Sequence, residues 1–170
     1  MKKVTPSNTP TIFSVYAEDK KGLTGQLMML FNRPSYNVHS INIARTDISD
    51  IILITIEADV PDGLILPFVN RLKKVVEVYD VVASQTELKK IGFYNLSVAI
   101  LKQNMWPLMD KFGATVCHIN DDNLVISKTG CDKDLLELYG MLEGPYLISF
   151  CKSGLINENA FIQMGSNLSF

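Results

Sequence analysis

Apolar and polar positions in the first half of the chain change period in a regular order. The apolar run TIFSVYA, residues 11–17, is typical of a buried strand. Beyond it, Leu23, Leu27 and Phe31 recur at helical spacing, which predicts a helix over residues 22–33 that the following proline ends. The first two elements are therefore a strand and an amphipathic helix.

Two strands come next. Residues 37–46 alternate between apolar and polar side chains, but the apolar side shifts partway, after Val38. The aliphatic run in residues 50–59 predicts a second, more buried strand. We expect these two strands to form a hairpin across residues 46–50.

A second helix and a closing strand complete the first half. The helix is expected over residues 63–75, where one helical stripe holds Ile65, Phe68, Leu72 and Val75. Residues 76–83 then alternate as a strand. The resulting order, β-α-β-β-α-β, is that of a ferredoxin-like domain.

The same order recurs after a polar connector at residues 85–90. Its strands are expected at 93–101, 114–119, 124–129 and 146–153, and its helices at 105–112 and 132–142. Asp132 is expected to cap the last helix. The fold class is therefore α+β, with two tandem ferredoxin-like βαββαβ domains.

This pattern divides the chain into four parts: a polar arm (1–10), a first domain (11–86), a second domain (87–156) and a tail (157–170). Domains of this size bury a modest core and are often supplemented by association. Their sheets also present open edge strands, where copies of a chain commonly pair. A homodimer is expected.

Charge and composition exclude several functions. The net charge is −2, and each half contains at least as many acidic as basic residues. Nucleic-acid binding, which uses an excess of Lys and Arg, is disfavoured. The polar amino terminus and the short apolar runs argue against a signal peptide or a membrane span, so we expect a cytoplasmic protein. The three cysteines form no CxxC pair, as is usual for ordinary thiols in a reducing compartment.

The segment KKGLTGQL places Gly22 at the start of the first helix. It lacks the spacing of a phosphate loop, and its GLTG quartet matches only the bare GxxG of an RNA-binding fold. The free amide groups at a helix start attract a carboxylate, and glycine permits close approach. Asp19 is then a candidate acceptor for an ammonium group, and Asn37 a donor and acceptor across the loop. Alternatively, Gly22 only turns the chain, Asp19 caps the helix and Asn37 satisfies a loop carbonyl.

Metal and catalytic sites find little support. Cys117 and His118 are adjacent on a predicted strand, where neighbouring side chains point to opposite faces, and no second histidine lies near. His39 is equally isolated on another strand. We find no nucleophile with a base and an orienting group at recognisable spacing. A binding module is favoured over an enzyme.

Taken together, Glu18, Asp19 and Gly22, the Leu-Phe that closes the helix, and the Tyr-Asn-Val corner at residues 36–38 resemble the ACT domain of the small regulatory subunit of acetolactate synthase. The closing strand KVVEVYDV is similar to that family's closing strand. The segments KFGATVCHINDDNLVISKTG and ISFCKSGLI resemble the family's second domain, so the similarity covers most of the chain from about residue 12 to 156.

The resemblance implies a non-catalytic protein that binds and activates a catalytic large subunit in branched-chain amino-acid biosynthesis. It also implies feedback inhibition by valine, or a related amino acid, bound between two ACT domains. Thiamine diphosphate, magnesium and FAD would belong to the catalytic subunit, and this chain would bind no cofactor. The effector-binding residues carried over from the family are Asp19, Gly22, Leu23, Asn37 and Val38.

Two positions depart from the family pattern. Asp19 stands where valine-regulated members carry Asn, which places a negative charge near the ligand's carboxylate. Pro34 and Ser35 replace a basic residue and a Gly before the Tyr, so the shape of the loop that carries Asn37 stays open. The alternatives are a free-standing tandem amino-acid sensor of another pathway and an unrecognised small enzyme that uses Cys117 or His118.

Overall fold

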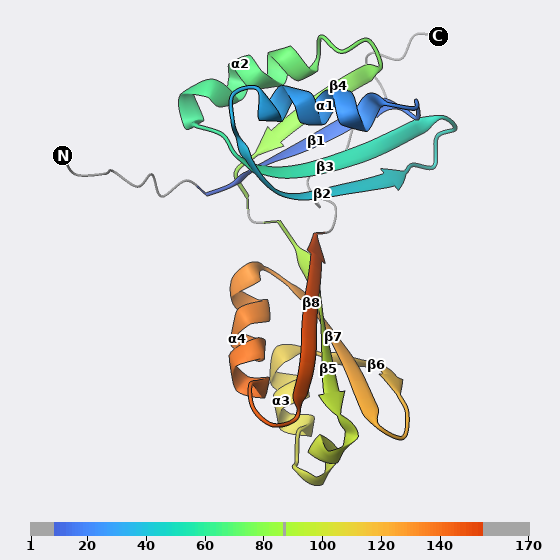
Figure 1. Cartoon of the computed structure of the whole chain (residues 1–170), viewed down its shortest axis with the longest axis vertical. Coiled ribbons are helices and arrows are strands. Elements are labelled where there is room, and N and C mark those ends of the chain that lie inside the picture. The colour runs from blue at the N-terminus through green and yellow to red at the C-terminus, as the bar shows by residue number, and fades with distance from the viewer. Residues whose placement is uncertain (1–8, 87, 155–170) are drawn as a thin grey trace, which may run out of the picture. The chain divides into compact units, whose positions relative to one another are not determined.

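The computed structural model describes residues 9–86 and 88–154 of the 170-residue chain (Figure 1). The chain divides between Leu88 and Lys89 into two compact units. The expected tail (157–170) lies outside the described residues, as does the expected arm (1–10) apart from its last two positions. No helix in the described part of the chain is long and apolar enough to cross a membrane.

The first unit has the expected ferredoxin-like order. Its elements are β1 (Thr11–Glu18), α1 (Leu23–Asn32), β2 (Asn37–Arg45), β3 (Ile51–Asp59), α2 (Asp62–Leu72) and β4 (Val78–Ser84). The strands form one antiparallel sheet in the order β2-β3-β1-β4, so β2 and β4 are its edges. The prediction of this fold from residue periodicity is confirmed for this unit.

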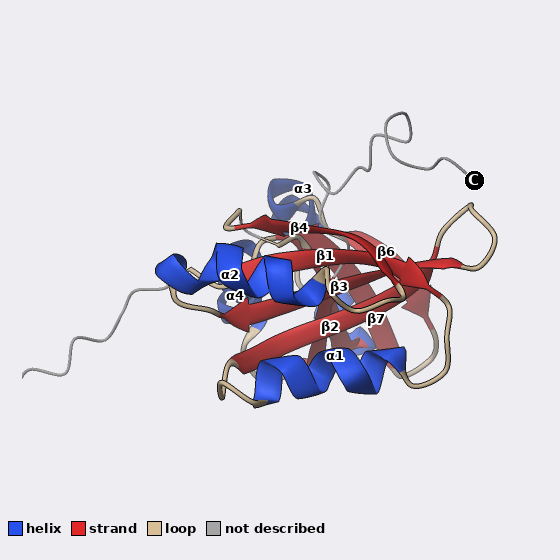
Figure 2. Ribbon diagram, turned by 90° about the horizontal axis from the view of Figure 1, so that it is seen from above, coloured by secondary structure: helices blue, strands red, loops and turns tan. Residues whose placement is uncertain are grey.

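Both helices of the first unit lie against one face of its sheet (Figures 1 and 2). Beneath them, Phe13 of β1, Phe31 of α1 and Phe68 of α2 meet edge to face, with ring centroids 4.7 to 5.6 Å apart. All three rings are buried. Burial of such rings contributes about 2 kcal/mol each, and their mutual contact fixes both helices on the sheet.

A β-bulge explains why the apolar side of β2 shifts partway along the strand. Val38 pairs with Ala58 and Ser40 pairs with Glu57, which leaves His39 as an extra residue. Beyond the bulge, Ile41 again lies on the same side of the sheet as the core. Both apolar stretches of β2 therefore face the helices.

The second unit repeats the order with one added turn. Its elements are β5 (Lys90–Ser97), a 3₁₀ turn (Val98–Lys102), α3 (Trp106–Phe112), β6 (Thr115–Ile119), β7 (Asn123–Gly130), α4 (Asp132–Leu142) and β8 (Leu147–Gly154). The sheet order is β6-β7-β5-β8. The strand expected over 93–101 was wrong at its end, because Ser97 accepts a hydrogen bond from the amide of Ala99 and starts the 3₁₀ turn.

The core of the second unit contains one buried hydroxyl. The side chain of Tyr94 is fully buried and donates a hydrogen bond of 2.7 Å to the carbonyl oxygen of Leu135 on α4. Burial raises the pKa of Tyr94 to about 12. Because its hydroxyl is satisfied, Tyr94 joins strand and helix without the cost of an unpaired polar group.

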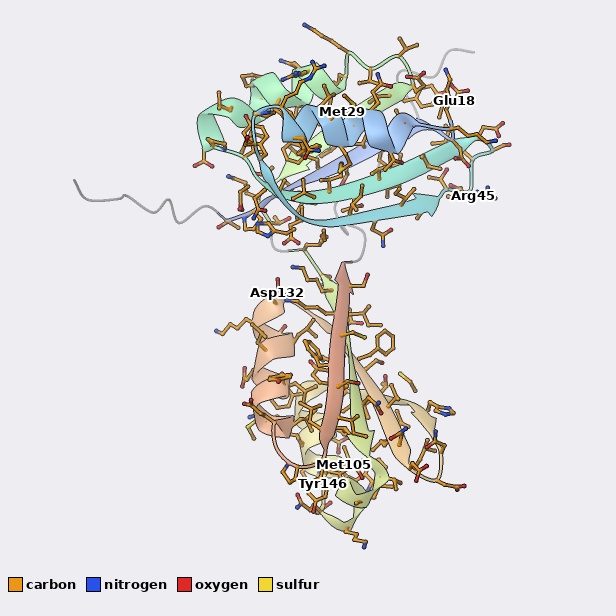
Figure 3. All side chains as sticks on the ribbon, viewed as in Figure 1. Glu18, Met29, Arg45, Met105, Asp132 and Tyr146 are labelled. Atoms are coloured by element: carbon orange, nitrogen blue, oxygen red, sulfur yellow. The ribbon has the colours of Figure 1, made fainter. Side chains whose placement is uncertain are left out.

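The sequence predicted that Asp132 caps α4, and this prediction was wrong. Asp132 instead occupies the first turn of the helix. Cys131 takes the cap position, and its amide donates to the carboxylate of Asp134 at 3.3 Å. The carboxylate of Asp132 instead accepts hydrogen bonds from Lys90 on β5 and Lys152 on β8. It joins the first and last strands of the unit at the start of α4, where Figure 3 labels Asp132.

Replacing Asp132 by Asn should destabilise the second unit. Burial alone would raise the pKa of Asp132, but the hydrogen bonds from Lys152 and Lys90 outweigh it, so the pKa lies below the ordinary value. Because 37% of the side chain is exposed, the expected loss at pH 7 is about 1 kcal/mol. Fluorescence of Trp106, the chain's only tryptophan, reports this unfolding during urea titration.

The pH dependence of the stability difference between wild type and Asp132→Asn distinguishes the loss of these ion pairs from other effects of the substitution. A lowered carboxyl pKa stabilises the fold above the unfolded-state value of about 3.9, and the contribution is lost as the pH falls through the folded-state pKa. The difference between wild type and Asp132→Asn should therefore be greatest near neutrality and shrink below about pH 4. Asp121→Asn, in an exposed turn, is the control. A difference that does not change with pH would contradict this account.

Candidate functional site

The turn before α1 holds the first group of candidate residues. Gly22 has φ of 87°, in the left-handed region that a side chain disfavours, and it occupies the cap position with no side-chain cap. The preceding loop is anchored where the amide of Asp19 donates to the carbonyl of Asp50 at 2.8 Å. Lys20 adds an exposed ion pair with Glu77 at 2.7 Å. The loop therefore presents the start of α1 in a defined position.

Backbone amide groups are available at this helix start. The amide of Leu23 donates to the carbonyl of Lys20 at 3.3 Å, but within the described residues those of Thr24 and Gly25 have no acceptor. Such amides and the helix dipole favour an anion. Leu23 itself is 2% exposed, so neither its side chain nor its backbone offers a ligand appreciable surface. This arrangement suits the carboxylate of a small molecule.

Asp19 does not cap α1. Its carboxylate instead lies 3.5 Å from the guanidinium Nε of Arg45, at the end of β2, and both side chains are exposed. Figure 3 shows Arg45 at the same end of the unit as Glu18, the residue before Asp19. Arg45 offsets the negative charge that Asp19 brings to the site, although an exposed pair contributes at most about 1 kcal/mol.

The second group of candidate residues lies past the other end of α1. The amide nitrogen of Asn37 donates to the carboxylate of Asp59 at 3.3 Å, and the Nε2 atom of His39 lies 2.8 Å from the other oxygen of the same carboxylate. The sequence had suggested that His39 is isolated, but it lies beside Asp59. Asn37 pairs with the same carboxylate rather than with a loop carbonyl. Val38 packs partly against the core beneath α1.

Asp59 is a neighbour of these residues that the sequence patterns did not indicate. The expected hairpin does bring the end of β3 back to the start of β2, which was the available signal. The bulge at His39 sets which residues meet there, because it places both Asn37 and His39 at Asp59. Strand periodicity alone does not reveal that placement.

The two groups are far apart within one chain. Asp19 is hydrogen-bonded to Asp50, just before β3, whereas Asn37 pairs with Asp59 at the far end of β3. The nine residues of β3 span about 27 Å at the usual rise of a strand. No single small ligand can touch both groups in the same copy of the first unit.

Ser35 settles the shape of the loop that carries Asn37. Its φ is 59°, and the amides of Ser35 and Tyr36 donate to the carbonyls of Asn32 and Phe31. This is the Schellman pattern that usually places Gly at the left-handed position. The ring of Tyr36 also packs on Phe68, with centroids 5.1 Å apart. The serine therefore adopts the backbone that the family's glycine would favour.

The remaining candidates are not brought together. In the described part of the chain, no group of three or more His, Cys, Asp or Glu side chains is placed to hold a metal ion. Cys117 is exposed on β6, where its strand register shifts between Val116 and His118. In the second unit, a shallow hollow of about 340 Å³ lies beside the edge strand β8, lined by Leu136, Tyr139 and residues 147–150.

Two ferredoxin-like units in tandem, the first with an open glycine-led helix start, give the chain an ACT-like fold. No protein-family model matches the chain. The chain is 24% identical over 161 residues to the acetolactate synthase small subunit of Mycolicibacterium smegmatis, covering 92% of this chain and 93% of that one. A probable acetolactate synthase small subunit from Archaeoglobus fulgidus is 23% identical over 139 residues, covering 76% of this chain and 87% of that one.

A solved structure confirms the fold. The crystal structure of the acetolactate synthase small subunit from Thermotoga maritima matches with a TM-score of 0.74 at 17% identity, covering 85% of this chain and 93% of that one. The chain is thus homologous to proteins named acetolactate synthase small subunit, and the resemblance predicted from its sequence is confirmed.

The strain at Ser35 gives a testable prediction. Left-handed backbone costs an L-residue about 1–2 kcal/mol, and glycine removes this cost. Glycine also makes the unfolded chain more flexible, which cancels part of the gain in stability. Ser35→Gly should therefore raise the free energy of unfolding by about 0.5–1 kcal/mol, measured by urea titration with circular dichroism. Ser49→Gly, at a residue without positive φ, is the control and should not stabilise. Destabilisation by Ser35→Gly would contradict the assignment.

Proposed function

We propose that the chain is a non-catalytic regulatory subunit of acetolactate synthase. It binds and activates the catalytic large subunit in the cytoplasm, and valine or a related branched-chain amino acid acts through it to lower activity. Thiamine diphosphate, magnesium and FAD are then held by the catalytic subunit. The observation that carries this proposal is similarity to named small subunits over nearly the whole length of both chains.

The helix start suits one end of the proposed effector. The free amides of Thr24 and Gly25 receive its carboxylate, and Gly22 keeps side-chain atoms out of the way. Asp19 is a charged acceptor for its ammonium group, and Arg45 limits the repulsion between Asp19 and the ligand's carboxylate.

The other half of the site comes from a second copy. Among the described strands, β2 is an edge of its sheet and pairs only with β3. If two copies pair through β2 in antiparallel fashion, in the register centred on Ile41, the backbone of Asn37 of the second copy lies opposite that of Arg45 of the first. Arg45 contacts Asp19, so this pairing brings Asn37 and Val38 of one copy to the Gly22 turn of the other.

Exposed apolar side chains support pairing along β2. Ile41 and Ile43 lie on the helix-covered side of this edge strand, yet 41% and 48% of their surfaces are exposed. Met29 on the neighbouring α1 is 57% exposed. A second copy would cover this side of the strand and satisfy its free backbone groups. The proposed oligomer is therefore a homodimer with two effector sites.

The first experiment measures acetolactate formation by the purified catalytic subunit from the same genome. Adding this chain should raise the rate, and valine should then lower it by about fivefold or more, the usual range of allosteric coupling. Asn37→Ala should still activate but should respond weakly to valine. A rise without a valine effect would overturn valine as effector, and no rise would favour a free-standing sensor.

The dimer is tested separately by a charge at the β2 edge. Ile43→Lys should convert the dimer to a monomer in sedimentation equilibrium, because a lysine on an edge strand opposes edge pairing. Val116→Lys is the matched control, since Val116 is 44% exposed on β6, an edge strand of the second unit. Loss of the dimer in the control but not in Ile43→Lys would contradict pairing through β2.

A further inference from the structure

One carboxylate beside the candidate site holds two side chains at once. Asp59, the last residue of β3, accepts a hydrogen bond from the amide nitrogen of Asn37 at 3.3 Å through Oδ2, and its Oδ1 lies 2.8 Å from Nε2 of His39. Its side chain is 38% exposed, as is that of His39 at 37%. The cluster is thus open to solvent on one side and built on two paired strands.

The chemistry of this cluster fixes the direction of the Asn37 amide. An ionised carboxylate only accepts hydrogen bonds, whereas an amide has one donor end and one acceptor end. The NH₂ group of Asn37 must therefore face Asp59, because the opposite orientation would bring two oxygens together. The carbonyl oxygen Oδ1 of Asn37 is then directed away from Asp59 and is free to accept.

His39 holds the carboxylate itself. Its Nε2 lies 2.8 Å from the second oxygen of Asp59, so both carboxylate oxygens have a neighbour on β2. The bulge places His39 next to Asn37 at this carboxylate while Ile41 returns to the core side of the sheet. Asn37 and His39 of β2 thus both meet one carboxylate on β3.

We propose that Asp59 is a positioning residue that sets the polarity of the effector site. It turns Asn37 so that the amide oxygen, and not the amide nitrogen, is presented to the ligand's ammonium group. This inference rests on the proposed function and deepens it, because it assigns recognition of the amino group to a residue outside the expected contact set. The site then selects ligands with a positive donor, while the start of α1 in the other copy receives the carboxylate.

The ligand test compares valine with 2-hydroxyisovalerate, which keeps the carboxylate but replaces the ammonium with a neutral hydroxyl. Binding of both to the full chain is followed by NMR titration. In Asp59→Ala the preference for valine over the hydroxy acid should fall about tenfold, because a charge-assisted hydrogen bond is lost from valine alone. Asp59→Asn keeps an acceptor for Asn37 and should restore most of the preference.

A matched control and a ligand-free readout separate this role from general damage. Asp80→Ala removes another partly exposed, ion-paired carboxylate of the same unit and should leave the preference unchanged. Without ligand, the side-chain amide resonances of Asn37 should move in Asp59→Ala and stay in place in Asp80→Ala. Equal weakening of both ligands by Asp59→Ala, or unmoved Asn37 resonances, would overturn the inference.

Failure of the proposed function is distinguishable. If the wild-type chain binds neither valine nor leucine nor isoleucine, the effector proposal fails, and recognition of an ammonium group through Asp59 fails with it. If valine binds and the two ligands weaken equally, only the role of Asp59 is overturned.

Discussion

The length of β3 is the constraint on which the two-copy effector site depends. The Gly22 turn is anchored at Asp50, before one end of β3, and Asn37 pairs with Asp59 at the other end of this strand, which spans about 27 Å. Each copy of the first unit therefore carries two half-sites. An antiparallel contact between two β2 edges joins unlike half-sites, which links effector binding to association of the chains. Binding and dimerisation then stabilise each other by the same free energy.

Electrostatics in the first unit follow the same division. At the Gly22 turn, the amides of α1 favour an anion, and the charge of Asp19 is offset by Arg45. At the other half-site, the carboxylate of Asp59 lies against Asn37 and His39 of the paired strand β2, so its negative charge has neighbours within its own copy. A zwitterionic ligand matches this arrangement: the start of α1 receives its carboxylate, while Asp19 of the same copy and the amide oxygen of Asn37 of the other copy accept from its ammonium group.

Much of the fold follows from periodicity alone. The apolar run of β1 and the helical spacing of Leu23, Leu27 and Phe31 predict their elements within one or two residues. Even the bulge left a signal, because the apolar side of β2 shifts after Val38. The contact between Asn37 and Asp59 was not predictable, since it depends on register across a bulge. The 3₁₀ turn after Ser97 was missed because a side-chain hydrogen bond overrides an apolar run.

The candidate residues divide in the same way. Gly22 was identifiable because it directly precedes the helical spacing of apolar residues, where a glycine can adopt the left-handed backbone, and its φ is indeed 87°. The conformation of Ser35 was not predictable, because sequence alone does not tell whether a serine adopts left-handed backbone. In this structure it does, with a φ of 59°. The pairing of Asp19 with Arg45 was not predictable either, since β3 lies between β1 and β2 and the side chain of Arg45 must reach past it.

The most direct measurement is valine binding to a mixed dimer, purified through two different tags. One chain carries Gly22→Asp and the other Asn37→Ala. Neither homodimer retains an intact site, but the mixed dimer recombines the unaltered Gly22 turn of one chain with the unaltered Asn37 of the other. A site shared between copies predicts about one valine per mixed dimer, bound at wild-type affinity. No binding to the mixed dimer, when wild type binds valine, would contradict it.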